Sequence, residues 1–160
     1  MTILTAVDGE TTPSELVTEG QRLAEKFGEP HVVLHVMPQR VFDDYQAATG
    51  APSSSSAAVS YGGENTDSGA RYTLDDGEGH ATGIARDVVR ATLGGVDDVV
   101  LQGRVGEPVT EILAEADRRD AQYVVVGCRK RTPVGKAVFG SATQSILLNT
   151  DRPIVAVPSE

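Results

Sequence analysis

The sequence has 160 residues, a length typical of one domain with a core of its own. Hydrophobic residues make up 39% of it, and no apolar run approaches the ~18 residues of a membrane-spanning helix, which excludes membrane insertion and indicates a soluble globular protein. The 23 Asp and Glu residues against 14 Lys and Arg give a formal charge of −9, which opposes binding to nucleic acids or to anionic membranes.

Three further features of the composition concern the protein's environment. Residues 1–8 lack the basic and apolar stretches and the cleavage site of a signal peptide, which predicts a cytoplasmic protein. An acid-rich chain in which Arg outnumbers Lys suits a salt-rich cytoplasm, so we expect a halophilic source. The single cysteine, Cys128, excludes an internal disulfide and a cysteine-built zinc site.

Short apolar runs alternate with helical patterns along the chain, which is typical of buried parallel strands joined by helical crossovers. The predicted strands cover residues 3–7, 31–36, 98–101, 122–127 and 153–157. Between the first two, Thr12, Pro13 and Glu15 predict a capped helix start. The expected buried stripe of that helix is Leu16, Gly20, Leu23 and Phe27, and Gly28 ends it.

Three more helices are predicted from apolar spacing and end signals. One covers about residues 81–93, with Ile84, Ala85, Val88 and Val89 facing the sheet. The next follows the turn at residues 106–108 and buries Val109, Ile112, Leu113 and Ala116. The last begins at Ser141, where Gln144 would complete a capping box, and ends near Asn149. The alternating order predicts an α/β domain with an open five-stranded parallel sheet.

Residues 39–79 interrupt this pattern within the single domain of residues 1–160. They carry the serine run at residues 53–56, two adjacent glycines and few large apolar side chains. Such a composition cannot bury enough surface to offset the ordering of its backbone. We therefore expect a mobile insertion, either a solvated linker or a lid that orders over a ligand.

Candidate binding residues gather where parallel strands end, the edge of an open sheet at which ligands bind. Asp8, Val36 and Gly127 end predicted strands, and Ser141 opens the last helix. A helix N-terminus offers free amides, and Gly140 allows close approach of the backbone to an anion, so a phosphate site is predicted. The alternatives are purely structural roles: Asp8 would form a turn at the strand end, and Ser141 would cap its helix. The cations Arg129, Lys130, Arg131 and Lys136 line the loop before that helix, where they either meet phosphates or form a solvated face.

The spacing Gly127-x2-Lys130-x9-Gly140-Ser141 resembles the G-x2-G-x9-G-[S/T] nucleotide motif of the universal stress protein family, with Lys130 in place of the second glycine. Residues 2–8, 106–108, 123–127 and 151–157 are also similar to that family. The resemblance covers nearly the whole chain outside residues 39–79. It implies a Rossmann-like sheet of order 3-2-1-4-5 with helices on both faces, usually in a dimer, and ATP bound in some members but not in others.

Transferred residue by residue, the resemblance implies an ATP site with Mg²⁺ bridging the phosphates. Asp8, together with Ala6 and Val7, would contact the adenosine, and Val36 would lie near the adenine. Gly127 would lie beneath the ribose and phosphates. Lys130 would either pair with a phosphate or alter the backbone that glycine permits. The remaining phosphate contacts would come from Arg129, Gly140, Ser141, Ala142 and Thr143.

No catalytic constellation is present: the sequence has no Gly-x-Ser-x-Gly elbow and no full Walker A motif. His31, His35 and His80 lack metal-ligand spacing, and His35 is expected in the core or an interface. Cys128 is either a small buried residue or a thiol with a pKa lowered by nearby cations. The prediction is therefore an ATP-binding stress-response regulator with an unknown protein partner, and no enzyme. The alternatives are a nucleotide-free dimerisation module and a slow ATPase or phosphotransferase.

The last predicted strand, from Pro153 to Val157, is expected to form a homodimer. It lies at the edge of the implied strand order, where unpaired backbone groups invite another strand. Ile154, Val155 and Val157 carry no charge to protect such an edge, so pairing with a second copy would cover it. The alternative is an edge blunted by Pro153 and Pro158.

Overall fold

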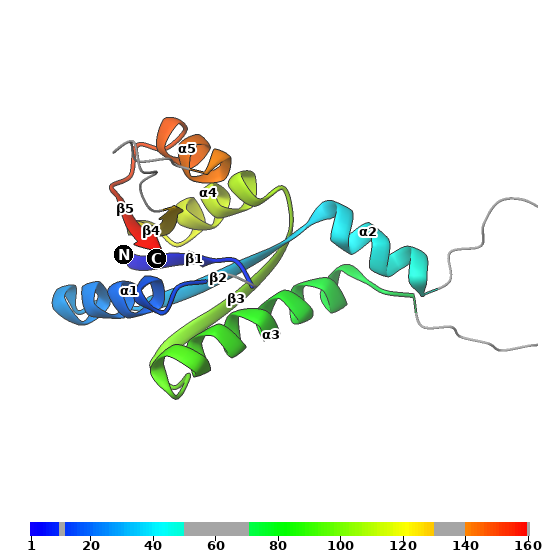
Figure 1. Cartoon of the computed structure of the whole chain (residues 1–160), viewed down its shortest axis with the longest axis horizontal. Coiled ribbons are helices and arrows are strands. Elements are labelled where there is room, and N and C mark those ends of the chain that lie inside the picture. The colour runs from blue at the N-terminus through cyan, green and yellow to red at the C-terminus, as the bar shows by residue number, and fades with distance from the viewer. Residues whose placement is uncertain (10–11, 50–70, 130–139, 160) are drawn as a thin grey trace, which may run out of the picture.

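The computed structural model describes residues 1–9, 12–49, 71–129 and 140–159. Strands and helices alternate along most of the chain (Figure 1). The strands are β1 (Thr2–Val7), β2 (His31–Pro38), β3 (Val99–Gly106), β4 (Ala121–Arg129) and β5 (Ile154–Ser159). The helices are α1 (Ser14–Phe27), α2 (Gln39–Ala48), α3 (Leu74–Leu93), α4 (Pro108–Arg118) and α5 (Ser141–Leu148).

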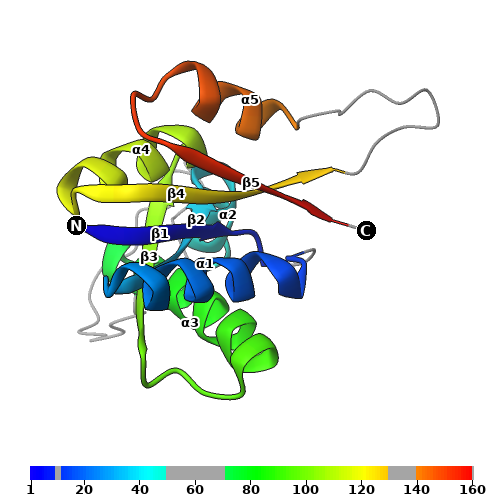
Figure 2. The ribbon, with the colours of Figure 1, turned by 90° about the vertical axis from the view of Figure 1, so that its left-hand side faces the viewer.

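The strands form one parallel sheet in the order β3-β2-β1-β4-β5, which confirms the predicted fold class. Helices α1 and α3 cover one face of this sheet, and α4 and α5 cover the other (Figure 2). Successive strand residues therefore enter different cores. Ile3 and Val33 pack beneath α1 and α3, whereas Leu4 and Leu34 pack beneath α4 and α5.

The predicted strands lie in the right places but are too short, since β3 continues to Gly106 and β4 to Arg129. Apolar patterning cannot follow these ends, because polar and glycine residues carry the strands past the core. The predicted buried stripe of α1 is wrong at Phe27, which is 40% exposed. Its ring stacks on Tyr123 of β4 with centroids 5.5 Å apart, at the rim of the core.

Both predicted capping boxes are wrong. Pro13 and Gly140 are the N-cap residues of α1 and α5, and neither helix has a side-chain cap. The Thr12 hydroxyl donates instead to the Asp8 carbonyl oxygen. A reciprocal capping box occurs at the start of α3, where Thr73 and Asp76 satisfy each other's backbone amides, as this pair of residue types does at helix starts.

The predicted insertion is wrong at both of its ends, because α2 and the first turns of α3 lie within residues 39–79. Helix α2 buries one large apolar side chain of the segment, that of Phe42. Phe42 is 6% exposed and packs with Met37 and Ala81. Gly77 makes that contact possible, since a Cβ there would lie 2.8 Å from Phe42 Cδ2. The rest of the predicted insertion, residues 50–70, lies outside the described residues.

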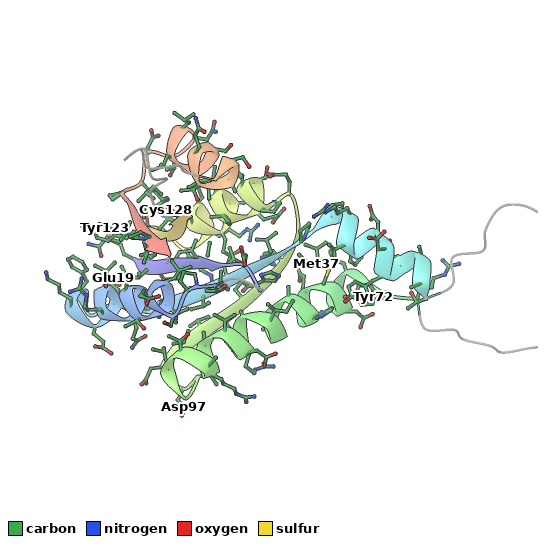
Figure 3. All side chains as sticks on the ribbon, viewed as in Figure 1. Glu19, Met37, Tyr72, Asp97, Tyr123 and Cys128 are labelled. Carbon is green, nitrogen blue, oxygen red and sulfur yellow. The ribbon has the colours of Figure 1, made fainter. Side chains whose placement is uncertain are left out.

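Helix α2 and the first half of α3 project beyond the sheet as a pair (Figure 1). Aromatic rings join them away from the main core: Tyr45 stacks on Tyr72, with centroids 5.2 Å apart. The Tyr72 amide donates to the Thr49 hydroxyl oxygen at 3.3 Å, and Gln46 Nε2 donates to the Tyr72 carbonyl at 3.1 Å. Met37 and Tyr72 mark the two ends of this packing in Figure 3.

A buried carboxylate links α4 to the edge strand β3. The Glu115 side chain is 1% exposed and bonds to Arg104 Nε at 3.0 Å, to Arg119 Nε at 2.5 Å and to Arg118. Arg104 also reaches Glu78 of α3, with 3.3 Å between Nη1 and Oε1. Burial alone would raise the pKa of Glu115, but hydrogen bonds from Arg119 and Arg104 hold this pKa below its usual value.

Candidate functional site

A split opens in the sheet between β1 and β4, at the carboxyl ends of the strands. The pairing of these two strands ends at Thr5 and Val125. Strand β4 runs on beside β5 as far as the pair of Arg129 and Ser159. The strand order reverses at this position, because chain connections run from β1 to β2 on one side and from β3 across to β4 on the other. Ligands of open α/β sheets bind at such switch points.

The end of β1 forms one wall of the split. Ala6 packs toward α4 and α5, and Asp8, which directly follows the strand, is exposed. Val7 faces the other way, into the core beneath α1. Of the three residues expected against adenosine, the structure therefore places the side chains of Ala6 and Val7 on opposite faces of the strand, and Asp8 just past its end.

Strand β2 supports this wall from the side. Val36 is 7% exposed and lies in the same core as Ile112 of α4, so its side chain forms part of the floor rather than an exposed surface. His35, the preceding residue, is buried, as the sequence predicted. Its ring nitrogen Nδ1 lies 2.9 Å from the carbonyl oxygen of Val7.

The N-terminus of α5 lies over the end of β4 and forms the other wall (Figure 2). The Thr143 hydroxyl, which is nearly buried, donates to the Gly127 carbonyl at 2.8 Å and ties helix to strand. Ser141 and Ala142 are exposed. No amide of Ser141, Ala142 or Thr143 donates to another residue within the described part of the chain. These free donors and the helix dipole favour an anion at this position.

Gly140 and Gly127 of this wall differ in the space next to them. Gly140 has an ordinary φ of −60°, so its backbone does not require glycine. A Cβ on Gly140 would meet no described atom within 4 Å, which leaves open space next to the free amides. A Cβ on Gly127 would make an ordinary contact of 3.9 Å with Leu16 Cδ2. The glycine at position 140 therefore matters for what approaches the helix, and not for the packing of the chain itself.

Part of the predicted site lies outside the described residues: Lys130, Arg131 and Lys136, together with the side chain of Arg129. Cys128 is half-buried on β4 (Figure 3). The described residues contain no cluster of three His, Cys, Asp or Glu side chains that would hold a metal ion.

Sequence reasoning missed the residues that hold the turn after β1. Gly9 lies against Ile84 of α3, and a Cβ on Gly9 would approach Ile84 Cγ2 to 2.6 Å. Thr12 donates to the Asp8 carbonyl, as described above. The pair Asp8-Gly9 marked a turn in the sequence, but no local pattern shows which helix packs on it.

The sheet order, the helices on both faces and the split at the switch point define a doubly wound α/β domain of the Rossmann type. The profile of the Universal stress protein family matches residues 1–158. The chain belongs to that family. None of the described helices combines the length and the apolar character of a membrane-spanning segment.

A universal stress protein of Mycolicibacterium smegmatis is 44% identical to this chain over 54 residues. That match covers 33% of this chain and 42% of the relative, so it spans less than half the length of the relative.

Solved structures of the family share the fold over nearly the full length. A universal stress protein from Archaeoglobus fulgidus has 23% identity and a TM-score of 0.57, with 98% of each chain covered. One from Lactobacillus plantarum has 16% identity and a TM-score of 0.57, over 98% of this chain and 96% of that one. A third, solved in complex with cAMP, has 15% identity and a TM-score of 0.54, over 99% of this chain and 97% of that one. At these identities, the similarity concerns the fold alone.

Proposed function

We propose that this protein is a small cytoplasmic regulator that binds an adenine nucleotide, ATP with Mg²⁺, in the split between β1 and β4. The observation that carries the proposal is the free N-terminus of α5, which the bond from Thr143 to Gly127 holds over the end of β4. The related structure in complex with cAMP supports an adenine nucleotide as the ligand. Binding would favour one conformation or assembly over another, and a protein partner would recognise the favoured state.

The described residues suggest how the nucleotide would lie. The phosphates would meet the amides of Ser141, Ala142 and Thr143, next to the open space at Gly140. The adenosine would lie toward Asp8 on the opposite wall. Because the described residues offer no metal-binding cluster, Mg²⁺ would be held mainly by phosphate oxygens and water, as this ion commonly is. Because the sequence has neither a Gly-x-Ser-x-Gly elbow nor a full Walker A motif, we propose a binding protein rather than an enzyme.

Filling the open space at Gly140 should prevent nucleotide binding. We expect calorimetry with ATP and Mg²⁺ to detect one site in the wild-type protein and none in Gly140→Val, because the valine side chain would occupy the approach to the free amides. Gly79→Val is the matched control, since a Cβ on Gly79 also meets open space but lies on α3, away from the split. This control should bind like the wild type.

Two results would contradict the proposed site. Equal ATP affinity of Gly140→Val and the wild type would place the nucleotide elsewhere. A wild-type protein without binding heat or thermal shift for any adenine nucleotide would favour the alternative function, a nucleotide-free dimerisation module.

We also propose a homodimer through β5. This strand is one edge of the sheet, and its Ile154, Val155 and Ala156 are half-buried in the single chain. Phe27 stays 40% exposed on the α1 side of the sheet, where it stacks on Tyr123 of the neighbouring strand β4. Pairing of β5 with its copy across a two-fold axis would cover this edge and its apolar residues.

A charge on β5 should break this dimer. We expect sedimentation to give the dimer mass for the wild type and the monomer mass for Val155→Lys, because the ammonium group would be desolvated in the interface. Val100→Lys is the control, since Val100 is 42% exposed on β3, the opposite edge strand. Circular dichroism should confirm that both variants fold. A monomeric wild type, or a folded Val155→Lys variant that keeps the dimer mass, would refute the interface.

A further inference from the structure

The side chain of His35 contacts the end of β1, where the turn at Asp8 begins. The ring is 9% exposed on β2, and its Nδ1 lies 2.9 Å from the Val7 carbonyl oxygen. A carbonyl only accepts hydrogen bonds, so Nδ1 carries a hydrogen and donates it. The hydrogen bond therefore fixes the tautomer of the neutral ring as the Nδ1–H form, and it restrains the last peptide group of β1.

The same ring lies next to Gly9. A Cβ on Gly9 would be 3.9 Å from His35 Cε1 and 2.6 Å from Ile84 Cγ2, so the turn lies between the β2 ring and helix α3. The Thr12 hydroxyl donates to the Asp8 carbonyl oxygen and so restrains the same turn. Asp8 thus sits between two restrained positions, with Val7 held by His35 before it and Gly9 packed on Ile84 after it.

We infer that His35 is a positioning residue for the nucleotide site: it fixes the backbone from Val7 to Gly9 and so orients Asp8 toward the ligand. The inference rests on the proposed function, because it assigns a role within that site. Its structural half, the restraint of the turn, holds whether or not nucleotide is bound. The two halves can therefore be tested separately.

The chain offers a matched control for His35. His31 lies four residues earlier on the same strand and faces the same side of the sheet. Its ring is also buried and bonded through both nitrogens, to Thr5 and to Gln21. His31 pairs in the sheet with Ile3, at the opposite end of β1 from Asp8. Loss of the two hydrogen bonds of His31 should lower the stability of the fold without changing the nucleotide site.

The test compares His35→Phe, His35→Asn and His31→Phe. Phenylalanine keeps the ring volume at position 35 and removes the donor, whereas asparagine places an amide donor near the Nδ1 position. In His35→Phe we expect the amide hydrogens of Asp8 and Gly9 to exchange with solvent at least about tenfold faster than in the wild type. We also expect this variant to bind ATP about tenfold more weakly. His35→Asn should recover most of both losses, and His31→Phe should show neither.

The outcomes separate the inference from the proposed function. Unchanged Asp8 and Gly9 exchange in a folded His35→Phe variant would overturn the inference, whatever the nucleotide affinities. Faster exchange with unchanged ATP affinity would overturn the positioning role while nucleotide binding stands. A wild type that binds no nucleotide would refute the proposed function and, with it, the positioning role. If His35→Phe does not fold, ¹⁵N spectra of the wild-type imidazoles decide, since a neutral His35 with its hydrogen on Nε2 would contradict the inference.

Discussion

Acidification from pH 8 to pH 4 is expected to lower the free energy of unfolding by about 3 kcal/mol through His31 alone. Burial lowers the pKa of His31 from its ordinary value of 6.5 to about 4. The unfolded chain therefore binds a proton as the pH falls through 6.5, while the folded protein stays neutral until about pH 4. This contribution of His31 to the free energy of unfolding is present in full above pH 6.5 and is lost as the pH falls from 6.5 to about 4.

Neighbouring residues explain why this ring stays neutral. Gln21 Nε2 donates to Glu25 Oε1 at 2.9 Å, which orients the Gln21 amide. The Gln21 oxygen then accepts from His31 Nδ1 at 3.0 Å, so His31 Nε2 has no hydrogen and accepts from the Thr5 hydroxyl at 2.9 Å. Helix α1 closes over this pair, since a Cβ on Gly20 would lie 2.5 Å from Nε2. A proton on Nε2 would require the Thr5 hydroxyl to change from donor to acceptor.

Urea unfolding of the wild type and of His31→Gln at constant ionic strength would measure the effect. The difference between the two proteins should change by about 1.4 kcal/mol between pH 8 and pH 5.5, a range in which few carboxylates titrate. Taking the difference removes the other titrating groups. A difference that stays constant with pH would mean that His31 has an ordinary pKa in the folded protein.

The second large effect is expected at Glu115, where Glu115→Gln should lower the free energy of unfolding by about 3 kcal/mol. The variant leaves the Arg104, Arg118 and Arg119 guanidinium groups around a neutral amide that also carries hydrogens. Removing one partner of a buried ion pair typically costs 3–5 kcal/mol, and the partial exposure of these arginines puts Glu115 at the lower end. Thermal or urea unfolding at pH 7 would measure this loss.

Glu111→Gln is the control for Glu115→Gln. Glu111 lies one helical turn earlier on α4 and faces Arg118 at 4.0 Å, with its side chain 25% exposed. A pair of this kind contributes at most about 1 kcal/mol. If the two variants lost equal stability, the buried cluster would be no more important than a surface ion pair.

The parallel sheet was predictable because its strands are almost uninterrupted apolar runs, as in Val32, Val33 and Leu34, which only a sheet buried on both faces requires. Helix α2 was not predicted, because residues 39–79 as a whole contain few large apolar side chains, which is typical of a segment without stable structure. The spacing of Phe42 and Tyr45 is nonetheless helical, and Thr73 with Asp76 is a helix-start signal. Serines and glycines at residues 50–70 do not exclude helices at both ends of such a segment.

The candidate ligand-binding residues could be predicted from the sequence, but the residues that hold them in place could not. Asp8, Gly127 and Ser141 follow from strand ends and a helix start, which are local features of the sequence. The roles of His35 and Ile84 depend on contacts between elements far apart in the chain. The same holds in part for Glu115: Arg118 and Arg119 are its neighbours three and four residues along the chain, but Arg104 reaches the carboxylate only when α4 packs on β3.

The short pairing of β1 with β4 divides the sheet into two ladders. Strands β3, β2 and β1 form one ladder, β4 and β5 form the other, and only the stretch from Thr2 to Thr5 joins them. His35 attaches the turn at Asp8 to the first ladder, and Thr143 attaches the start of α5 to the second. Helix α1 spans the seam between the ladders, because it packs with Val7 of the first ladder and with Val125 and Val157 of the second, so the width of the split depends on the packing of this helix.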